Sequence, residues 1–300
     1  QFMTSRPGFE TRCLSSLSKV FADEQLSDGP IAKGSALRGE VYSFQVAYRS
    51  DSLVRDARVS VESELSDTIT LRRVGLVPSE LPWRDGHDDD LLRTTPGLYP
   101  DPLYPLDGTG VTAFPGQWRS IWVTVDLSSD RGPRGERGRR GEGAGTPPEP
   151  GSYPIRVAFE TEDGEPLGGA EFVLEILPAT LPEQELICTE WFHVDCLATY
   201  YGLEIFGEEH WKRIEQLVED AVRHGVNMIL TPIFTPPLDT AVGGERPTVQ
   251  LVDVHAVNGA RGGGAREYRF GFDRLERWVD LCDRLGVRYF EFSHLFTQWG

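Results

Sequence analysis

The last third of this sequence alternates between strand-like and helix-like hydrophobic patterns, and this alternation restricts the fold more than any other feature. Three stretches have a strand-like pattern: the start of Ile187–Tyr201, all of Asn227–Phe234 and the start of Val287–Trp299. A helix-like stretch separates each from the next. Strand-helix-strand order is typical of a parallel sheet covered by helices. We therefore predict the first βα units of a (β/α)8 TIM barrel.

Both intervening stretches carry the signals of amphipathic helices. In Glu208–His224 and in Asp273–Leu285, apolar residues recur at intervals of three, four and seven, which gives one buried stripe. Gly225 and Gly286 stand where a left-handed residue ends a helix, and Asp273 is a candidate cap for the second one.

Polar and aromatic residues gather where the predicted strands end. A βα barrel builds its site at the carboxyl ends of its strands, so these side chains are expected to converge. The candidates for substrate binding are Trp191, His193, Asp195, Thr231, Glu291, His294, Gln298 and Trp299.

The region before residue 180 reads as all-β, with short alternating segments separated by Gly, Pro, Asp and Ser, and it predicts a β-sandwich. The predicted strands are Val41–Tyr48, Ala57–Val61, Ile69–Val77, Ser120–Val125, Tyr153–Phe159 and Ala170–Ile176. Tyr99–Leu106 is too rich in proline for a helix or a central strand, and we expect an ordered surface segment, lying against the barrel. Asp88, Asp89 and Asp90 fit a solvated loop better than a cation site.

These patterns divide the chain into a sandwich domain (1–178), a proline-containing linker (179–186) and the barrel portion (187–300). Residues 129–150 have almost nothing to bury and predict a flexible insertion. About 40 residues separate the second strand from the second helix, far more than the roughly 2–6 of a usual βα loop. Two strand-like runs lie there, Thr248–Val254 and Glu267–Phe272.

A closed barrel takes about 250 residues, so the predicted units do not complete a ring. We expect this chain to be the N-terminal part of a longer protein. Residues 1–300 alone should then be inactive and prone to aggregate through the apolar edge of the third strand.

The net charge of −17 disfavours nucleic acid and anionic membranes as partners. No stretch has the length of a membrane span or the pattern of a signal peptide, which favours a cytoplasmic protein. The four cysteines lack metal-site spacing and fit small core residues in a reducing compartment. We expect no metal and no cofactor, and the sequence specifies no oligomeric state.

Four motifs carry a family resemblance: Thr189–Cys196, Ile229–Pro237, Gly243–Pro247 and His294–Gly300. In this order they resemble the catalytic domain of glycoside hydrolase family 123 and its relatives, over about residues 180–300. The resemblance implies a retaining β-N-acetylgalactosaminidase in which the substrate's own acetamido group attacks the anomeric carbon. It also implies an adjacent Asp-Glu pair on a later barrel strand. Glu219-Asp220, on a helix, does not match that motif, so we assign no catalytic residue in this chain and expect the pair beyond Gly300.

The chemistry of this reaction explains why two carboxyl groups are needed. One must protonate the leaving oxygen, and the other must orient the acetamide. Within this chain, Trp191 and Trp299 would stack on the sugar, and the polar candidates would bind its hydroxyl groups.

Several candidates also have a purely structural interpretation. These are packing of Trp191 between strands, capping by Asp195 of a turn beginning near Leu197, a supporting role for His193, an ion pair inside the barrel for Glu291, and pairing of Arg246 with Glu245 or a nearby carboxylate.

Two other functions remain open. The first is a carbohydrate-binding or scaffold protein on a degenerate barrel. The second is a metal-dependent hydrolase that uses His193 and Asp195 at the end of the first strand together with His294, since histidine and carboxylate suit zinc.

Overall fold

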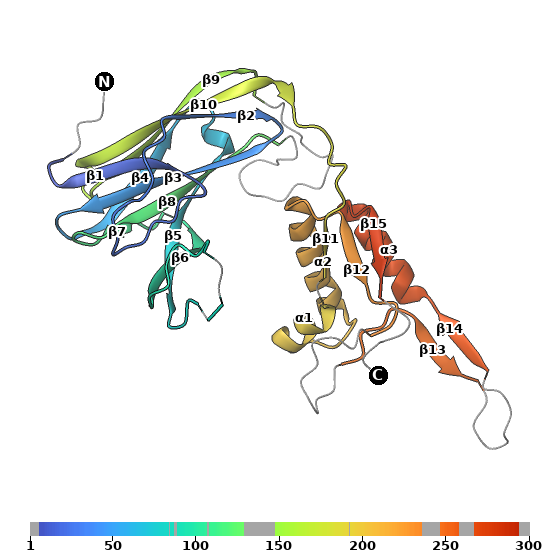
Figure 1. The fold of residues 1–300 in the computed structure, drawn as a ribbon. Helices are drawn as coiled ribbons and strands as arrows, with labels where there is room; N and C mark the ends of the chain where they lie inside the picture. Colours follow the sequence, from blue (N-terminus) through green and yellow to red (C-terminus); the bar gives the residue numbers. More distant parts are fainter. Residues whose placement is uncertain are drawn as a thin grey trace. The chain divides into compact units, whose positions relative to one another are not determined.

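The computed structural model describes residues 6–83, 85–86, 89–106, 108–128, 148–191, 193–235, 247–257 and 267–293 (Figure 1). The chain divides into two compact units, Gln1–Pro182 and Glu183–Gly300. The division falls within the predicted linker of residues 179–186. Among the described residues, no helix combines the length and the apolar character that a membrane span requires.

The first unit consists of two five-stranded sheets. The first sheet has the order β1-β3-β8-β5-β6 and the second β2-β10-β9-β4-β7. All neighbours are antiparallel except β2, which runs parallel to β10. The strands are β1 (Phe9–Ser15), β2 (Lys33–Arg38), β3 (Val41–Ser50), β4 (Val54–Glu62), β5 (Ile69–Ser79), β6 (Gly97–Pro105), β7 (Val111–Ala113), β8 (Arg119–Asp126), β9 (Gly151–Glu160) and β10 (Pro166–Thr180).

The two sheets share one hydrophobic core. Phe44 of β3 stacks on Phe172 of β10 at 4.2 Å between ring centroids, and Tyr48 of β3 meets Phe159 of β9 at 5.0 Å. The alternation along each strand explains this, because every second side chain of β3 faces the opposite sheet. The unit is therefore a two-layer β structure whose inner faces are both buried.

The six strands predicted in this unit are those with a neighbour on both sides: β3, β4, β5, β8, β9 and β10. The four strands that were not predicted, β1, β2, β6 and β7, all lie at sheet edges. The proline-rich segment Tyr99–Leu106 belongs mainly to β6, so it is an edge strand, and its packing against a barrel stays a prediction. Of the insertion predicted at 129–150, residues 129–147 lie outside the described residues.

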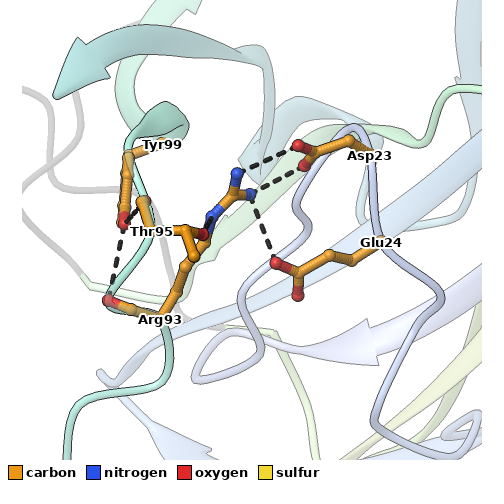
Figure 2. A network of polar contacts seen from close by, with 5 residues as sticks. All are labelled: Asp23, Glu24, Arg93, Thr95 and Tyr99. Atoms are coloured by element: carbon orange, nitrogen blue, oxygen red, sulfur yellow. Dashed lines mark hydrogen bonds and ion pairs between the residues drawn. The ribbon is translucent and has the colours of Figure 1, made fainter. Parts of the chain in front are cut away.

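An arginine fixes the segment that leads into β6 (Figure 2). The buried side chain of Arg93 donates two hydrogen bonds to the carboxylate of Asp23, at 2.7 and 2.9 Å, and its Nε donates to Thr95 Oγ1 at 3.1 Å. Glu24 adds an ion pair at 3.3 Å, and the guanidinium lies 5.3 Å from the ring centroid of Tyr99. The hydrogen bonds from Arg93 lower the pKa of the Asp23 carboxyl. This network ties two long loops of the first unit together.

The second unit contains the predicted parallel sheet. Its strands β11 (Thr189–Glu190), β12 (Met228–Thr231) and β15 (Tyr289–Phe292) are hydrogen-bonded in this order and all run parallel. Three helices accompany them: α1 (Val194–Tyr201), α2 (Glu208–Arg223) and α3 (Asp273–Leu285). This is the order expected for the first units of a βα barrel, whereas the closed eight-stranded ring stays a prediction.

The helices α2 and α3 form where the apolar spacing predicts them. Their stripes, including Trp211, Ile214 and Trp278, are buried together. Gly225 and Gly286 follow the helices with φ of 91° and 98°, as a left-handed helix end requires. The prediction that Asp273 caps α3 is wrong, because Asp273 is the first helical residue and the cap position is Phe272, which makes no side-chain cap.

The long connection between β12 and α3 differs partly from its prediction. It contains a hairpin of β13 (Asp253–Ala256) and β14 (Tyr268–Gly271), so the second predicted strand is close to its place. The first is wrong over most of its length. Residues 248–252 are not a strand, since Val249 and Leu251 instead bury their side chains in the core of this unit. The expected glycine tip, 259–264, lies outside the described residues.

The cysteines are free, but only two of the four are buried core residues as predicted, Cys13 and Cys282. Cys188 is partly buried. Cys196 is exposed on α1, because the segment that follows β11 forms a surface helix.

Candidate functional site

The register of the three parallel strands decides which side chains reach each face of the sheet. Ile229 pairs with Phe290, and both pack into the core with the helices. Side chains alternate along a strand, so the next partners, Leu230 and Glu291, project from the opposite face. We call this opposite side the open face of the sheet. Thr189 lies on it too, because it is in register with Met228, one residue before Ile229.

The open face carries a hydrogen-bonded group of three residues, Thr189, Trp191 and Glu291. The indole Nε1–H of Trp191 donates to Glu291 Oε2 at 2.8 Å. The hydroxyl of Thr189 donates to the same oxygen at 3.1 Å. The Trp191 side chain nevertheless remains half exposed, at 51% of its full accessible area. The group therefore presents a fixed aromatic surface just beyond the carboxyl end of β11.

This contact crosses the middle strand of the sheet. β12 lies between β11 and β15, and neighbouring strands are about 4.8 Å apart, so the two outer strands are separated by about 10 Å. The side chains of Trp191 and Glu291 thus meet above β12, on the side where Leu230 lies. Leu230 is almost fully buried although it belongs to the open face.

Thr231 occupies the other face of the sheet. Its side chain is fully buried, its hydroxyl donates to Ile229 O at 3.3 Å, and it accepts the indole N–H of Trp278 on α3, also at 3.3 Å. This arrangement uses Thr231 to satisfy a buried tryptophan. Of the predicted residues, the structure therefore brings Trp191 and Glu291 together and places Thr231 away from them.

His193 and Asp195 belong to the start of helix α1, not to the end of a strand. β11 ends at Glu190, His193 is the residue that precedes the helix, and Asp195 is buried in its first turn. The prediction that Asp195 caps a turn beginning near Leu197 is wrong, because the helix already begins at Val194. A carboxylate in the first turn is favourable, since the amino end of a helix carries partial positive charge.

A further residue, His210 of α2, positions this region and was not predicted. It is completely buried. Its Nδ1 accepts the backbone N–H of Phe206 at 2.9 Å, so its Nε2 donates to the carbonyl oxygen of Val194 at 2.8 Å. It thereby joins α2 to the first residue of α1. Its position four residues before Ile214, on the apolar stripe, is the sequence signal that indicates burial.

The amino ends of the strands are joined by Asn227. Its Oδ1 accepts the N–H of Cys188 at 2.8 Å, and its Nδ2 donates to Leu186 O at 3.0 Å. The backbone N–H groups of Arg288 and Tyr289 donate to its carbonyl oxygen. One residue thus holds all three strands at the edge opposite to the Trp191 group. It supports the sheet and is far from the expected substrate side.

The buried thiols do not supply nucleophiles. Burial raises the pKa of Cys282 to about 12 and that of Cys13 to about 12, so both stay protonated at neutral pH.

The described part of the chain contains no group of three or more His, Cys, Asp or Glu residues that could hold a metal ion. His294, Gln298 and Trp299 lie outside the described residues, as do Glu245 and Arg246. Of the three ligands in the metal-hydrolase hypothesis, His193 directly precedes α1, Asp195 lies in its first turn, and His294 lies outside the described residues.

Comparison with protein families gives a match within the second unit. Residues 191–300 match the family model of the glycoside hydrolase 123 catalytic domain. This confirms the resemblance carried by the sequence motifs over that range. A comparison with curated proteins found no significant match.

Solved structures give a likeness of fold. A family 123 glycoside hydrolase from Clostridium perfringens, studied for glycolipid glycan hydrolysis, superposes with a TM-score of 0.63 at 13% identity. The alignment covers 93% of this chain and 46% of that enzyme, so the chain spans less than half of its length. A β-glucosidase mutant from Listeria innocua reaches a TM-score of only 0.24 at 13% identity, covering 58% of this chain and 16% of its own. That value is too low to indicate a common fold.

Proposed function

We propose that this protein is a glycoside hydrolase that removes terminal β-linked N-acetylhexosamine, with N-acetylgalactosamine as the preferred sugar. The observation that carries the proposal is the match of residues 191–300 to the family 123 catalytic domain. The half-exposed Trp191, fixed at the carboxyl end of a parallel strand, supports it. An aromatic side chain in that place suits the apolar face of a sugar, and barrel enzymes build their sites at that edge.

The proposed reaction retains the anomeric configuration. The carbonyl oxygen of the substrate's acetamide attacks the anomeric carbon while a carboxylic acid protonates the leaving oxygen. Water then attacks the anomeric carbon from the face that the leaving group occupied and opens the cyclic intermediate, which restores the original configuration. The two carboxyl groups that this requires are assigned to a later strand of the complete barrel, outside this chain. Residues 183–300 contribute the first part of the sugar pocket.

Hydrolysis of p-nitrophenyl glycosides by the full-length protein tests the proposal. We expect release of p-nitrophenol from the β-N-acetylgalactosaminide. The β-galactoside, which has a hydroxyl group in place of the acetamide, should be inert because it lacks the nucleophile. Proton NMR of the first-formed sugar should show the β anomer.

Three results would contradict the proposal in different ways. Equal turnover of the β-galactoside would exclude the acetamide as nucleophile. An α product would indicate inversion. Sugar binding without any turnover would favour the carbohydrate-binding protein over the enzyme.

A further inference from the structure

We propose that Glu291 is a positioning residue of the sugar site, which holds the plane of the Trp191 indole and thereby sets the preference for galacto-configured sugars. The inference rests on the proposed function and adds a residue and a specificity to it. Glu291 belongs to β15, two strands away from the tryptophan that it binds.

An exposed tryptophan side chain does not keep one orientation by itself. Trp191 is half exposed and follows the last residue of the two-residue strand β11. Its two side-chain torsions have several accessible rotamers at such a site. The 2.8 Å hydrogen bond to Glu291 Oε2 selects the rotamer in which the indole edge points to β15. The orientation of the ring is then set by β15, two strands away in the sheet, and not by its own loop.

The Glu291 carboxylate is itself held in place, as a positioning group must be. Glu291 lies in the interior of β15, in register with Leu230 of β12. Its Oε2 also accepts the hydroxyl of Thr189 at 3.1 Å, and Thr189 is in register with Met228. Hydrogen bonds to an ionised acceptor are roughly twice as strong as neutral ones. Glu291 and Thr189 are thus both anchored in the strand ladder, and the donors to Glu291 among the described residues, Thr189 and Trp191, are uncharged.

The stereochemistry of the sugar links a fixed indole ring to a preference for galacto-configured sugars. A galacto-configured pyranose has an axial O4, so the hydrogens on C3, C4 and C5 all lie on one face and form a continuous apolar patch. A gluco-configured sugar lacks this patch, because its H4 lies on the other face. An indole ring held at one angle favours the sugar with the continuous apolar patch, whereas a mobile indole adapts to either sugar. Immobilising the indole in advance also removes an ordering cost from binding.

The test compares variants of the full-length protein that separate the ring from its positioning. Glu291→Ala removes the acceptor, while Glu291→Gln keeps an acceptor oxygen. Trp191→Phe keeps an aromatic face and removes the N–H donor. Affinities for N-acetylgalactosamine and N-acetylglucosamine are measured by calorimetry, and thermal unfolding shows which variants remain folded. The indole Nε1–H signal of Trp191, identified by its loss in Trp191→Phe, reports the hydrogen bond directly.

We expect Glu291→Ala to weaken N-acetylgalactosamine binding about 3- to 10-fold and to reduce the preference over N-acetylglucosamine. Glu291→Gln should restore most of both. In the Trp191→Phe background, Glu291→Ala should have little further effect, because the contact is already absent. The Trp191 Nε1–H signal should shift and exchange faster in Glu291→Ala.

Unchanged affinity, selectivity and indole exchange in Glu291→Ala would overturn the positioning role. So would an equal loss in the Trp191→Phe background, since Glu291 would then act on the sugar independently. If the indole responds but the unmodified protein binds neither sugar, the proposed function fails and the sugar role of Glu291 falls with it. The indole result identifies which of the two ideas is at fault.

Discussion

The two units of this protein use β-structure in opposite ways. In Gln1–Pro182, two sheets face each other and bury both inner surfaces, with Phe44 against Phe172 at the centre. In Glu183–Gly300, helices cover one face of a parallel sheet, and the other face carries hydroxyl, indole and carboxylate groups joined by hydrogen bonds. The first arrangement buries its apolar surface and so stabilises the fold. The second leaves chemically useful groups exposed, so the comparison predicts where mutations alter folding and where they alter binding.

The largest effects are expected from emptying each core in turn. Phe172 and Trp278 are both fully buried, and truncation of such a side chain to alanine costs about 3–5 kcal/mol. We expect Phe172→Ala to lower the unfolding transition of the two-layer unit and Trp278→Ala that of the helix-covered sheet. Unfolding in denaturant, monitored by hydrogen exchange of the backbone amides in each unit, measures the two transitions separately.

Phe270→Ala provides the matched control, because Phe270 is a large aromatic residue that is exposed on the β13–β14 hairpin. It should change stability by no more than about 0.5 kcal/mol. If either core variant destabilises both units equally, the description of two separate cores is wrong.

A smaller loss is expected from His210→Ala. The change leaves the N–H of Phe206 without its acceptor, which costs about 1–3 kcal/mol, and removes the hydrogen bond to the Val194 carbonyl oxygen, which contributes about 0.5–1.5 kcal/mol. We therefore expect about 2–4 kcal/mol of destabilisation, confined to the second unit, measured by urea unfolding. His224→Ala is the control, because His224 is exposed at the end of α2 and should be nearly neutral. An equal effect of both variants would mean that the link between α1 and α2 contributes nothing.

A still smaller effect is expected at Gly286, which ends α3 with φ of 98°. An L-residue with a Cβ is strained in this conformation by about 1–2 kcal/mol. Gly286→Ala should lose about that much stability in thermal unfolding, and Gly286→Asn should lose less, since asparagine tolerates left-handed backbone. Equal losses in both variants would show that packing around the site, and not backbone conformation, determines the cost.

Thiol labelling sharpens the comparison without changing stability. Cys196 is exposed on α1, whereas Cys13 and Cys282 are buried, one in each unit, with pKa values raised to about 12. Under native conditions iodoacetamide should modify Cys196 first, and Cys13 and Cys282 only after their own unit unfolds. Mass spectrometry of the labelled peptides reads this out. Rapid native labelling of Cys282 would contradict a closed core between the helices and the sheet.

The sequence predicts strands better in the middle of a sheet than at its edges. Along the interior strands β8 and β9, more buried side chains alternate with more exposed ones over most of the strand, which gives a period-two pattern in the sequence. The edge strand β6 contains three prolines, and β2 begins Lys33-Gly34-Ser35. Edges tolerate these residues and gain protection from unwanted pairing by them. Edge strands that contain such residues lack the regular alternation of apolar and polar residues, so this pattern does not reveal them.

Helices α2 and α3 were predictable because their apolar stripe and terminal glycine are local signals. Helix α1 was not, since its eight residues carry no clear stripe and its entry depends on His210, a residue from another helix. The pairing of Trp191 with Glu291 could not be predicted from the sequence either. Both were candidates individually, but only the register of three strands shows that they meet and that Thr231 faces away.

The account's central claim is that the open face of the parallel sheet, and not the two-layer unit, receives the sugar. Titration of the full-length protein with N-acetylgalactosamine, followed through the indole N–H signals of its tryptophans, tests this most directly. We expect the Trp191 signal to move in proportion to saturation, while the signals of Trp83, Trp118 and Trp122 in the two-layer unit stay in place. Movement of the Trp83, Trp118 or Trp122 signal with Trp191 unchanged would contradict the claim.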